Sequence, residues 1–279
     1  MEIPKPDNIE NVSDWVELKI SYDKSKLSKA QLARYIEENS GSESEESFTN
    51  NVWNELARRE SAYNNPPFKV ESKIVYSVID WEEIPAYLVC LIFSVYGGTH
   101  GLSASAKLFE RITSQTIERY GEFKTKIFGW PVGPSDPKDI KTRAEILARE
   151  MNEIFIEPPD AEKKDDTLDV AAWKPFHDGK SSQIVLLVQC ATGWHWEQKT
   201  RELRMKAWAQ YIHWGCDPVK GFAIPHIVGE RKWVDLALDA GLIIDRIRIY
   251  NILINKATDV PFRSELKMWC KEQIIRLDS

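Results

Sequence analysis

Two polar residues, Asp169 and Gln189, lie at the ends of two predicted neighbouring strands, where they could bind a divalent cation. Asp169 belongs to the alternating segment 168–173 (LDVAAW), and Gln189 follows the apolar run 184–188 (IVLLV). Alternation is typical of a half-buried strand, and a branched-aliphatic run is typical of a strand covered on both faces. The polar HDGK segment between them predicts a hairpin turn. Adjacent strand ends would bring a carboxylate and an amide oxygen together, and Mg²⁺ prefers such hard oxygen ligands.

Two further acidic residues are rival metal ligands. Asp165 and Asp166 lie just ahead of the first predicted strand, in an Asp-Asp-Thr sequence that is also ordinary turn or cap material. We favour Asp169 because it lies within the strand pattern.

A cysteine at the end of the second strand suggests different chemistry. Cys190 could act as a nucleophile with His195 or His177 as its base. A cysteine at the end of a hydrophobic strand is more often simply buried, so this cysteine-hydrolase interpretation is the weaker one.

The order of these residues resembles the restriction-endonuclease-like (PD-(D/E)XK) nuclease superfamily, whose signature is an Asp on one strand and Glu-x-Lys on the next. In the QCATG segment, Gln189 replaces the second acid and Ala191 replaces the lysine. The resemblance implies that Lys199 is a lysine displaced to the following helix. It also implies that Glu110, in LFERI, is the family's upstream helical acid. It covers roughly residues 100 to 255.

Similar FE…D…QCATG…K patterns belong to bacterial anti-phage defence nucleases. The resemblance therefore implies a metal-dependent endodeoxyribonuclease that hydrolyses DNA phosphodiester bonds. Asp169, Gln189 and the carbonyl of Cys190 would hold Mg²⁺ or Mn²⁺, which activates water and stabilises charge on the phosphate. Lys199 would assist the water, and Glu110 would restore the charge that a neutral glutamine lacks. An ATPase or sensor protein of the same system, or a second copy of the chain, is the protein partner that the resemblance implies.

A long helix, 194–213, is expected after this motif and carries several basic residues. Arg201, Arg204 and Lys206 lie on its polar faces, where they could follow a nucleic-acid backbone. The alternative is a solvated face with ion pairs along the helix.

The substitutions at Gln189 and Ala191 also favour a second function: a catalytically silent nuclease-fold scaffold or sensor subunit that binds a partner protein. Trp194, Trp196 and Trp208 lie in the same predicted helix and suit either a core or a partner interface.

Composition narrows the class of protein. The chain has 279 residues, 43% of them hydrophobic and 29% charged, which is ordinary for a globular protein. The net charge of −6 argues against a protein that coats nucleic acid non-specifically. Four widely spaced cysteines exclude a CxxC zinc site. We find neither an apolar run of about 20 residues nor a signal-peptide pattern, so we expect a cytoplasmic protein without a membrane span.

The predicted order of elements gives an α/β class, with a restriction-endonuclease-like mixed sheet flanked by helices. We expect a smaller, mainly helical N-terminal region over 1–80 and the nuclease domain over 81–279. The N-terminal region is either a winged-helix-like module or a helical cap on the main domain, and the absence of a concentrated basic helix favours the cap. The expected helices are 28–38, 48–65, 81–96, 103–120, 140–152, 194–213, 234–241 and 264–277, and the expected strands outside the motif are 15–22, 70–78, 124–128, 220–228 and 242–253.

Overall fold

The computed structural model divides the chain into two compact units, and the chain passes between them more than once. Unit 1 comprises residues 1–100, 225–229 and 246–279, and unit 2 comprises 101–224 and 230–245. These boundaries differ from the single division after residue 80, because segments distant in the sequence join the N-terminal residues in one unit. The residues described by the structure are 8–40, 46–97, 103–157, 163–254 and 260–278.

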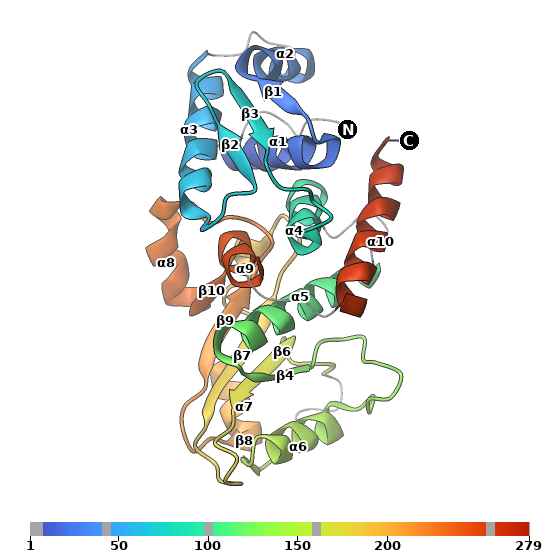
Figure 1. The fold of residues 1–279 in the computed structure, drawn as a ribbon. Helices are drawn as coiled ribbons and strands as arrows, with labels where there is room; N and C mark the ends of the chain where they lie inside the picture. The colour runs from blue at the N-terminus through green and yellow to red at the C-terminus, as the bar shows by residue number, and fades with distance from the viewer. Residues whose placement is uncertain (1–7, 41–45, 98–102, 158–162, 255–259, 279) are drawn as a thin grey trace. The chain divides into compact units, whose positions relative to one another are not determined.

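Unit 2 is built on a mixed five-stranded sheet with the order β10-β9-β7-β6-β4 (Figure 1). Strands β4, β6 and β7 are antiparallel neighbours, whereas β7, β9 and β10 run parallel. The mixed α/β class is therefore confirmed. The strands are β4 (Lys124–Ile127), β6 (Val170–Lys174), β7 (Ile184–Cys190), β9 (Val219–Ala223) and β10 (Leu242–Ile244).

Helices cover both faces of this sheet. Helix α5 lies on one side and helix α6 on the other (Figure 1). The Cys190 thiol contacts Thr113 of α5, whereas Leu187 packs in the core with Leu147 of α6 and Trp208 of α7. Odd and even residues of β7 thus face opposite sides, as strand geometry requires. The helices of unit 2 are α5 (Ser103–Gly121), α6 (Ile140–Glu150), the 3₁₀ turn η1 (Trp196–Lys199), α7 (Met205–Tyr211) and α8 (Glu230–Ala240), and a small pair of strands is β5 (Ile154–Phe155) with β8 (Ile212–His213).

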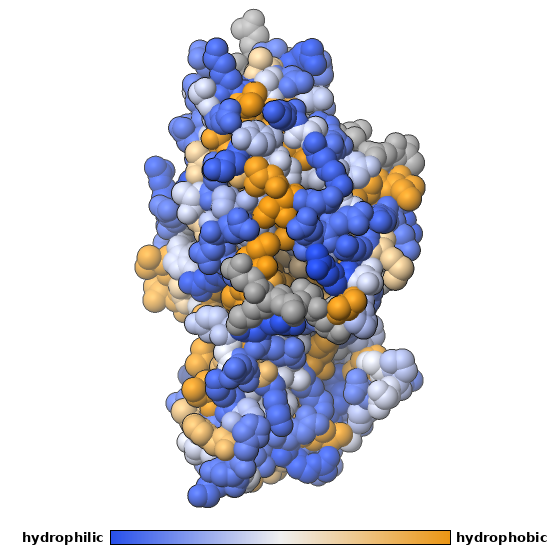
Figure 2. Space-filling view, in the orientation of Figure 1, coloured by the Kyte–Doolittle hydropathy of each residue, from blue (hydrophilic) through white to orange (hydrophobic). Residues whose placement is uncertain are grey.

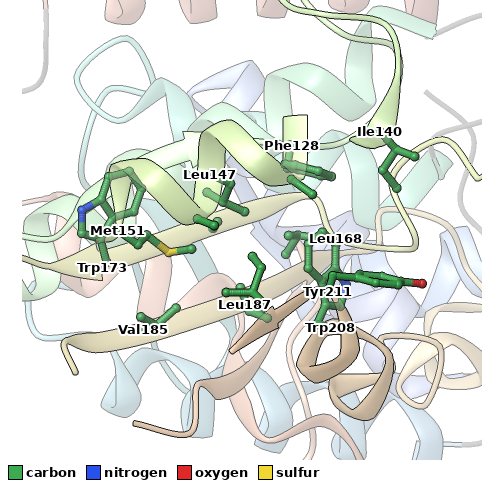
Figure 3. Close-up of a cluster of buried hydrophobic side chains, with 14 of the residues drawn as sticks. Phe128, Ile140, Leu147, Met151, Leu168, Trp173, Val185, Leu187, Trp208 and Tyr211 are labelled. Atoms are coloured by element: carbon green, nitrogen blue, oxygen red, sulfur yellow. The ribbon is translucent and has the colours of Figure 1, made fainter. Parts of the chain in front are cut away.

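The core between α6, α7 and the sheet holds two residues, Phe128 and Leu168, that lie next to the candidate site in the sequence. Leu168 is fully buried, and Phe128 meets Trp208 edge-to-face with ring centroids 5.3 Å apart (Figure 3). Such pairs contribute about 0.5–1.5 kcal/mol beyond the area they bury. The residues immediately after Phe128 and Leu168 are therefore held firmly, and they include Asp169.

Unit 1 contains a three-stranded antiparallel sheet with the order β1-β3-β2. Ser28 caps α2 as expected: its hydroxyl accepts from the Gln31 N–H, and its N–H donates to the Gln31 side chain. The winged-helix interpretation depends on the order helix, helix, strand, which α2, α3 and β2 follow. That interpretation stays a prediction. The elements are α1 (Ile9–Asp23), β1 (Lys26–Ser28), α2 (Lys29–Ser40), α3 (Glu46–Ala62), β2 (Phe68–Val70), β3 (Ile74–Ser77), α4 (Pro85–Tyr96), α9 (Arg246–Leu253) and α10 (Val260–Asp278).

A fully buried ion cluster joins three helices of unit 1. Arg59 of α3 donates to Asp14 and Glu17 of α1 at 2.6 and 2.7 Å. Arg246 of α9 donates to the same Asp14 oxygen at 2.6 Å. The neighbouring guanidinium groups hold the pKa of Asp14 low, at about 2, against the effect of burial. Both acids are therefore paired, which a buried charge requires.

Three predicted elements were wrong. Segment 15–22 belongs to helix α1 rather than to a strand, and segment 242–253 divides into short β10 and helix α9. The long helix 194–213 is replaced by η1, a connecting turn and the shorter α7. In the sequences of α1 and α9, polar residues alternate with apolar ones over several positions and imitate the period of a strand, although Glu17 and Arg246 among them are buried.

The face of the molecule shown in Figure 2 is mainly hydrophilic, with separate apolar patches. No helix in the described ranges has the length and apolar content needed to cross a bilayer.

Candidate active site

Two carboxylates, buried Glu110 and half-buried Asp169, lie close together where α5 packs against the start of β6. Glu110 is 3% exposed, and Asp169 immediately precedes β6. An ideal β-carbon at Gly129 would lie 2.7 Å from one oxygen of each, so these two oxygens are no more than twice that distance apart. Glycine at 129 leaves the space that the two carboxylates approach.

The proximity of the two carboxylates changes their acidity. The pKa of Asp169 is raised from 3.8 to about 8, first by burial and then by the charge of Glu110. The pKa of Glu110 is raised from 4.5 to about 7, chiefly by burial, although Lys107 opposes the rise. Two like charges in a dry site disfavour each other, so the pair retains a proton near neutral pH. A site of this kind favours a bound cation, which would compete with that proton.

Lys107 supplies the positive charge of the site. Its ammonium group donates to Glu110 Oε2 at 2.7 Å and also to the carbonyl of Gly129. Lys107 and Glu110 are three residues apart on α5, so one helix face presents both groups. The Lys107 side chain is partly exposed, with 25% of its surface accessible to solvent.

Asp169 departs from the regular pairing of β6 and β7. The ladder pairs Val170 with Val188 and would continue to Asp169 and Gln189. Instead, the Asp169 N–H donates to the Val188 carbonyl, one residue off that register. The Asp169 carboxylate accepts from the Cys190 N–H at 2.7 Å. The local irregularity lets the side chain approach Glu110 rather than remain beside Gln189.

A strained turn leads into Asp169. Asp166 and Thr167 have φ of 45° and 63°, a left-handed conformation that is costly for a β-branched threonine. Asp165 holds the turn by accepting from the N–H groups of Thr167 at 3.0 Å and Trp130 at 2.9 Å. Asp165 thereby ties the turn to the segment after Gly129, while its charge raises the pKa of both site carboxyls.

Gln189 ends β7 next to this site but has another partner. Its amide nitrogen donates to Glu202 at 2.9 Å. Its oxygen, Oε1, is buried and accepts no hydrogen bond from any residue in the described ranges. The structure therefore places Gln189 at the predicted strand end, without a hydrogen bond to Asp169 or Glu110, and leaves one oxygen donor unused.

The surroundings of Cys190 do not suit a thiolate nucleophile. Burial, and then the charge of Asp169, raise the pKa of this thiol well above its usual value. Its sulfur hydrogen-bonds Thr113, while His177 and His195 are both exposed. The thiol thus stays protonated, and a cysteine-hydrolase mechanism lacks support.

The other basic residues predicted for the site lie on the surface of unit 2. Lys199 ends η1 with an exposed side chain, and Lys206 is exposed on α7. Arg201 pairs with Asp239 at 2.8 Å, and Arg204 pairs with Asp166 at 3.1 Å. These four residues do not share one helix face, because the predicted long helix is divided. Their roles stay predictions.

The donor set is compatible with a hard divalent cation, although it is small. Within the described ranges, no three His, Cys, Asp or Glu side chains form a metal-binding group. Glu110 and Asp169 nevertheless provide two neighbouring carboxylates, and the missing β-carbon of Gly129 leaves space beside both. The unused Gln189 oxygen does not add to this set, because Gln189 lies on the same face of β7 as Leu187 and not on the α5 face. Oxygen donors of this kind suit Mg²⁺ or Mn²⁺, which complete their coordination with water.

Comparison with known proteins gives no family to which the chain can be assigned. No family model, curated protein or solved structure matches it.

Two residues of the site escape sequence reasoning, and each leaves a weak signal. Lys107 precedes Glu110 by three residues within the predicted helix 103–120, which is the spacing of a same-face ion pair. Gly129 lies just beyond the predicted strand 124–128, in a segment rich in glycine and proline. Neither signal says that these residues meet Asp169, which is 40 or more positions away.

Proposed function

We propose that this protein hydrolyses phosphodiester bonds of DNA with the help of a divalent cation, Mg²⁺ or Mn²⁺. The observation that carries the proposal is the close pair of carboxylates, buried Glu110 and half-buried Asp169, beside the partly exposed side chain of Lys107. The order of the site also agrees with the resemblance: a helical acid, a strand acid and then a second strand ending in a polar residue.

Each side chain has a role that follows from its position. Glu110 and Asp169 would hold the cation. Gln189 points to the same face of β7 as Leu187, the face covered by α6 and α7, so its oxygen has no role in this assignment. A bound divalent cation lowers the pKa of water and stabilises charge on a phosphate. Lys107 would contact a phosphate oxygen and place the scissile group against the carboxylates. Lys107 replaces Lys199 in this assignment because it touches Glu110.

The proposed biological setting is an effector of a bacterial anti-phage defence system that works with an ATPase or a sensor protein. This part of the proposal is supported by the sequence resemblance alone.

The test is cleavage of supercoiled plasmid DNA with Mg²⁺ or Mn²⁺. We expect Asp169→Asn, Glu110→Gln and Lys107→Met each to lower the rate by roughly 100-fold or more, as does loss of a transition-state contact elsewhere. Lys199→Met is the matched control and should retain activity. Electron paramagnetic resonance of bound Mn²⁺ gives a second measurement, which does not require DNA cleavage. Wild-type protein that neither cleaves DNA nor binds Mn²⁺ through Asp169 would overturn the proposal.

A second candidate function is a catalytically silent scaffold or sensor subunit that binds a partner protein. It is favoured by Gln189 and Ala191, which stand where the resemblance expects an acid and a lysine. Mn²⁺ binding without cleavage, in protein supplied with its activating partner, would support this alternative.

A further inference from the structure

An exposed tryptophan lies directly beside the carboxylate pair. Trp130 follows Gly129, and its N–H donates to Asp165 at 2.9 Å. Consecutive Cα atoms are about 3.8 Å apart, so the indole begins one residue from the position that both carboxylates approach. The residue remains 36% exposed, although neighbouring Phe128 is buried in the core. A large aromatic surface thus lies open to solvent at the edge of the site.

A lysine lies over the same indole ring. The ammonium group of Lys164 is 5.6 Å from the ring centroid of Trp130, which is within the range of a cation–π contact. A hydrogen bond fixes the backbone of Lys164, because the buried Arg143 donates to the Lys164 carbonyl at 2.7 Å. The Arg143 guanidinium in turn lies 4.2 Å above the ring centroid of Phe128. Contacts with the core thus hold the backbone of Lys164, and its ammonium group places a positive charge beside the aromatic ring of Trp130.

This pair has the chemistry of a binding site for an unpaired nucleotide. In a continuous duplex both faces of each base are covered by its neighbours, whereas an unpaired base offers a free face to an aromatic side chain. Base stacking on aromatic residues, combined with positive charges along the backbone, is the usual means of binding single strands. A blunt, fully paired duplex would gain only the charge contact.

We propose that Trp130 stacks an unpaired nucleobase and that Lys164 neutralises an adjoining phosphate, so that the site takes single-stranded DNA in preference to continuous duplex. This inference names the substrate class of the proposed nuclease and so rests on that proposed function. It concerns binding, however, and can be measured without cleavage.

The experiment is fluorescence anisotropy with a labelled oligothymidylate and with a duplex of the same length, both in EDTA. Wild-type protein should bind the single strand more tightly. Trp130→Ala should weaken that binding about 5- to 100-fold, whereas Trp130→Phe should keep most of it. Lys164→Gln should reduce the slope of log affinity against log salt by roughly 0.7. An oligouridylate arm distinguishes RNA from DNA.

Phe176→Ala is the matched control, because Phe176 is 70% exposed and lies beyond the other end of β6. Its affinity should equal that of wild type. Equal wild-type affinity for duplex and single strand, or equal affinity of the Trp130→Ala and Phe176→Ala proteins, would overturn the inference. Trp130-dependent binding by a protein that neither cleaves DNA nor binds Mn²⁺ through Asp169 would support this inference and overturn the proposed nuclease. Cleavage of DNA at the same rate by wild type and Trp130→Ala would support the proposed nuclease and refute this inference.

Discussion

Replacing Asp169 by asparagine should stabilise the cation-free protein at alkaline pH. The carboxylate accepts from the Cys190 N–H, and an asparagine oxygen can keep that hydrogen bond. Its other oxygen approaches Glu110, to which an asparagine amide can donate. The substitution thus preserves shape and removes the repulsion between two like charges.

The size of the effect follows from the raised pKa values. A carboxyl whose pKa is higher in the folded than in the unfolded state stabilises the fold below its unfolded pKa, and this stability is lost as pH rises through the folded pKa. For Asp169 the rise is from 3.8 to about 8, and for Glu110 from 4.5 to about 7. The shift of Asp169, acting alone, would correspond to about 6 kcal/mol. Because the two groups share the repulsion, we expect asparagine to recover about 2–3 kcal/mol at pH 9.

The assay is urea denaturation in EDTA at pH 5 and at pH 9, with unfolding followed by tryptophan fluorescence. At pH 5 the asparagine protein should gain only a small part of this difference, because the wild-type pair is still protonated in the fold while the carboxyls of the unfolded chain have begun to ionise. At pH 9 the asparagine protein should be the more stable. Added Mg²⁺ should stabilise only the wild type, because a ligand stabilises the state that binds it. A variant that is less stable at pH 9, or equally altered at both values, would refute the account of the coupled carboxylates.

Three further predictions concern the site and the two cores. Gly129→Ala should abolish Mn²⁺ binding because its β-carbon would lie 2.7 Å from both carboxylates, while Gly193→Ala, which meets nothing within 4 Å, should bind normally in the same titration. Arg59→Met should lower the free energy of unfolding of unit 1 by about 3–5 kcal/mol because it leaves buried acids short of a cation, whereas half-buried Arg58→Met should cost less than about 1 kcal/mol. Leu147→Ala should cost about 2–5 kcal/mol in denaturation of unit 2, because the side chain is fully buried; a loss below about 1 kcal/mol would contradict the packing shown in Figure 3.

Sequence patterns predicted the elements of unit 2 well where one face is apolar. Helices α5 and α6 and strands β6, β7 and β9 appear where the periodicity placed them. The class of the fold follows from their order. The pairing of Asp169 with Glu110 could not be derived in the same way, because it depends on a one-residue departure from the β6–β7 register.

Helix α1 shows why periodicity fails in unit 1. Nearly all its central residues are buried, including Asp14 and Glu17, so the helix has no polar face that would reveal its period. Their partners are Arg59 and Arg246, which lie far away in the sequence. An isolated segment cannot indicate that its charges will be neutralised by helices formed much later.

The ion cluster of unit 1 also bears on the order in which a nascent chain can fold. Asp14 and Arg246 are separated by 232 positions, so all of the intervening chain must be synthesised before this acid meets its second guanidinium. Until then, the N-terminal helices would hold Asp14 and Glu17 with Arg59 as their principal counterion. We therefore expect the N-terminal helices to be loosely packed in ribosome-bound intermediates. The ion cluster should form only after α9 has left the exit tunnel and Arg246 can reach Asp14.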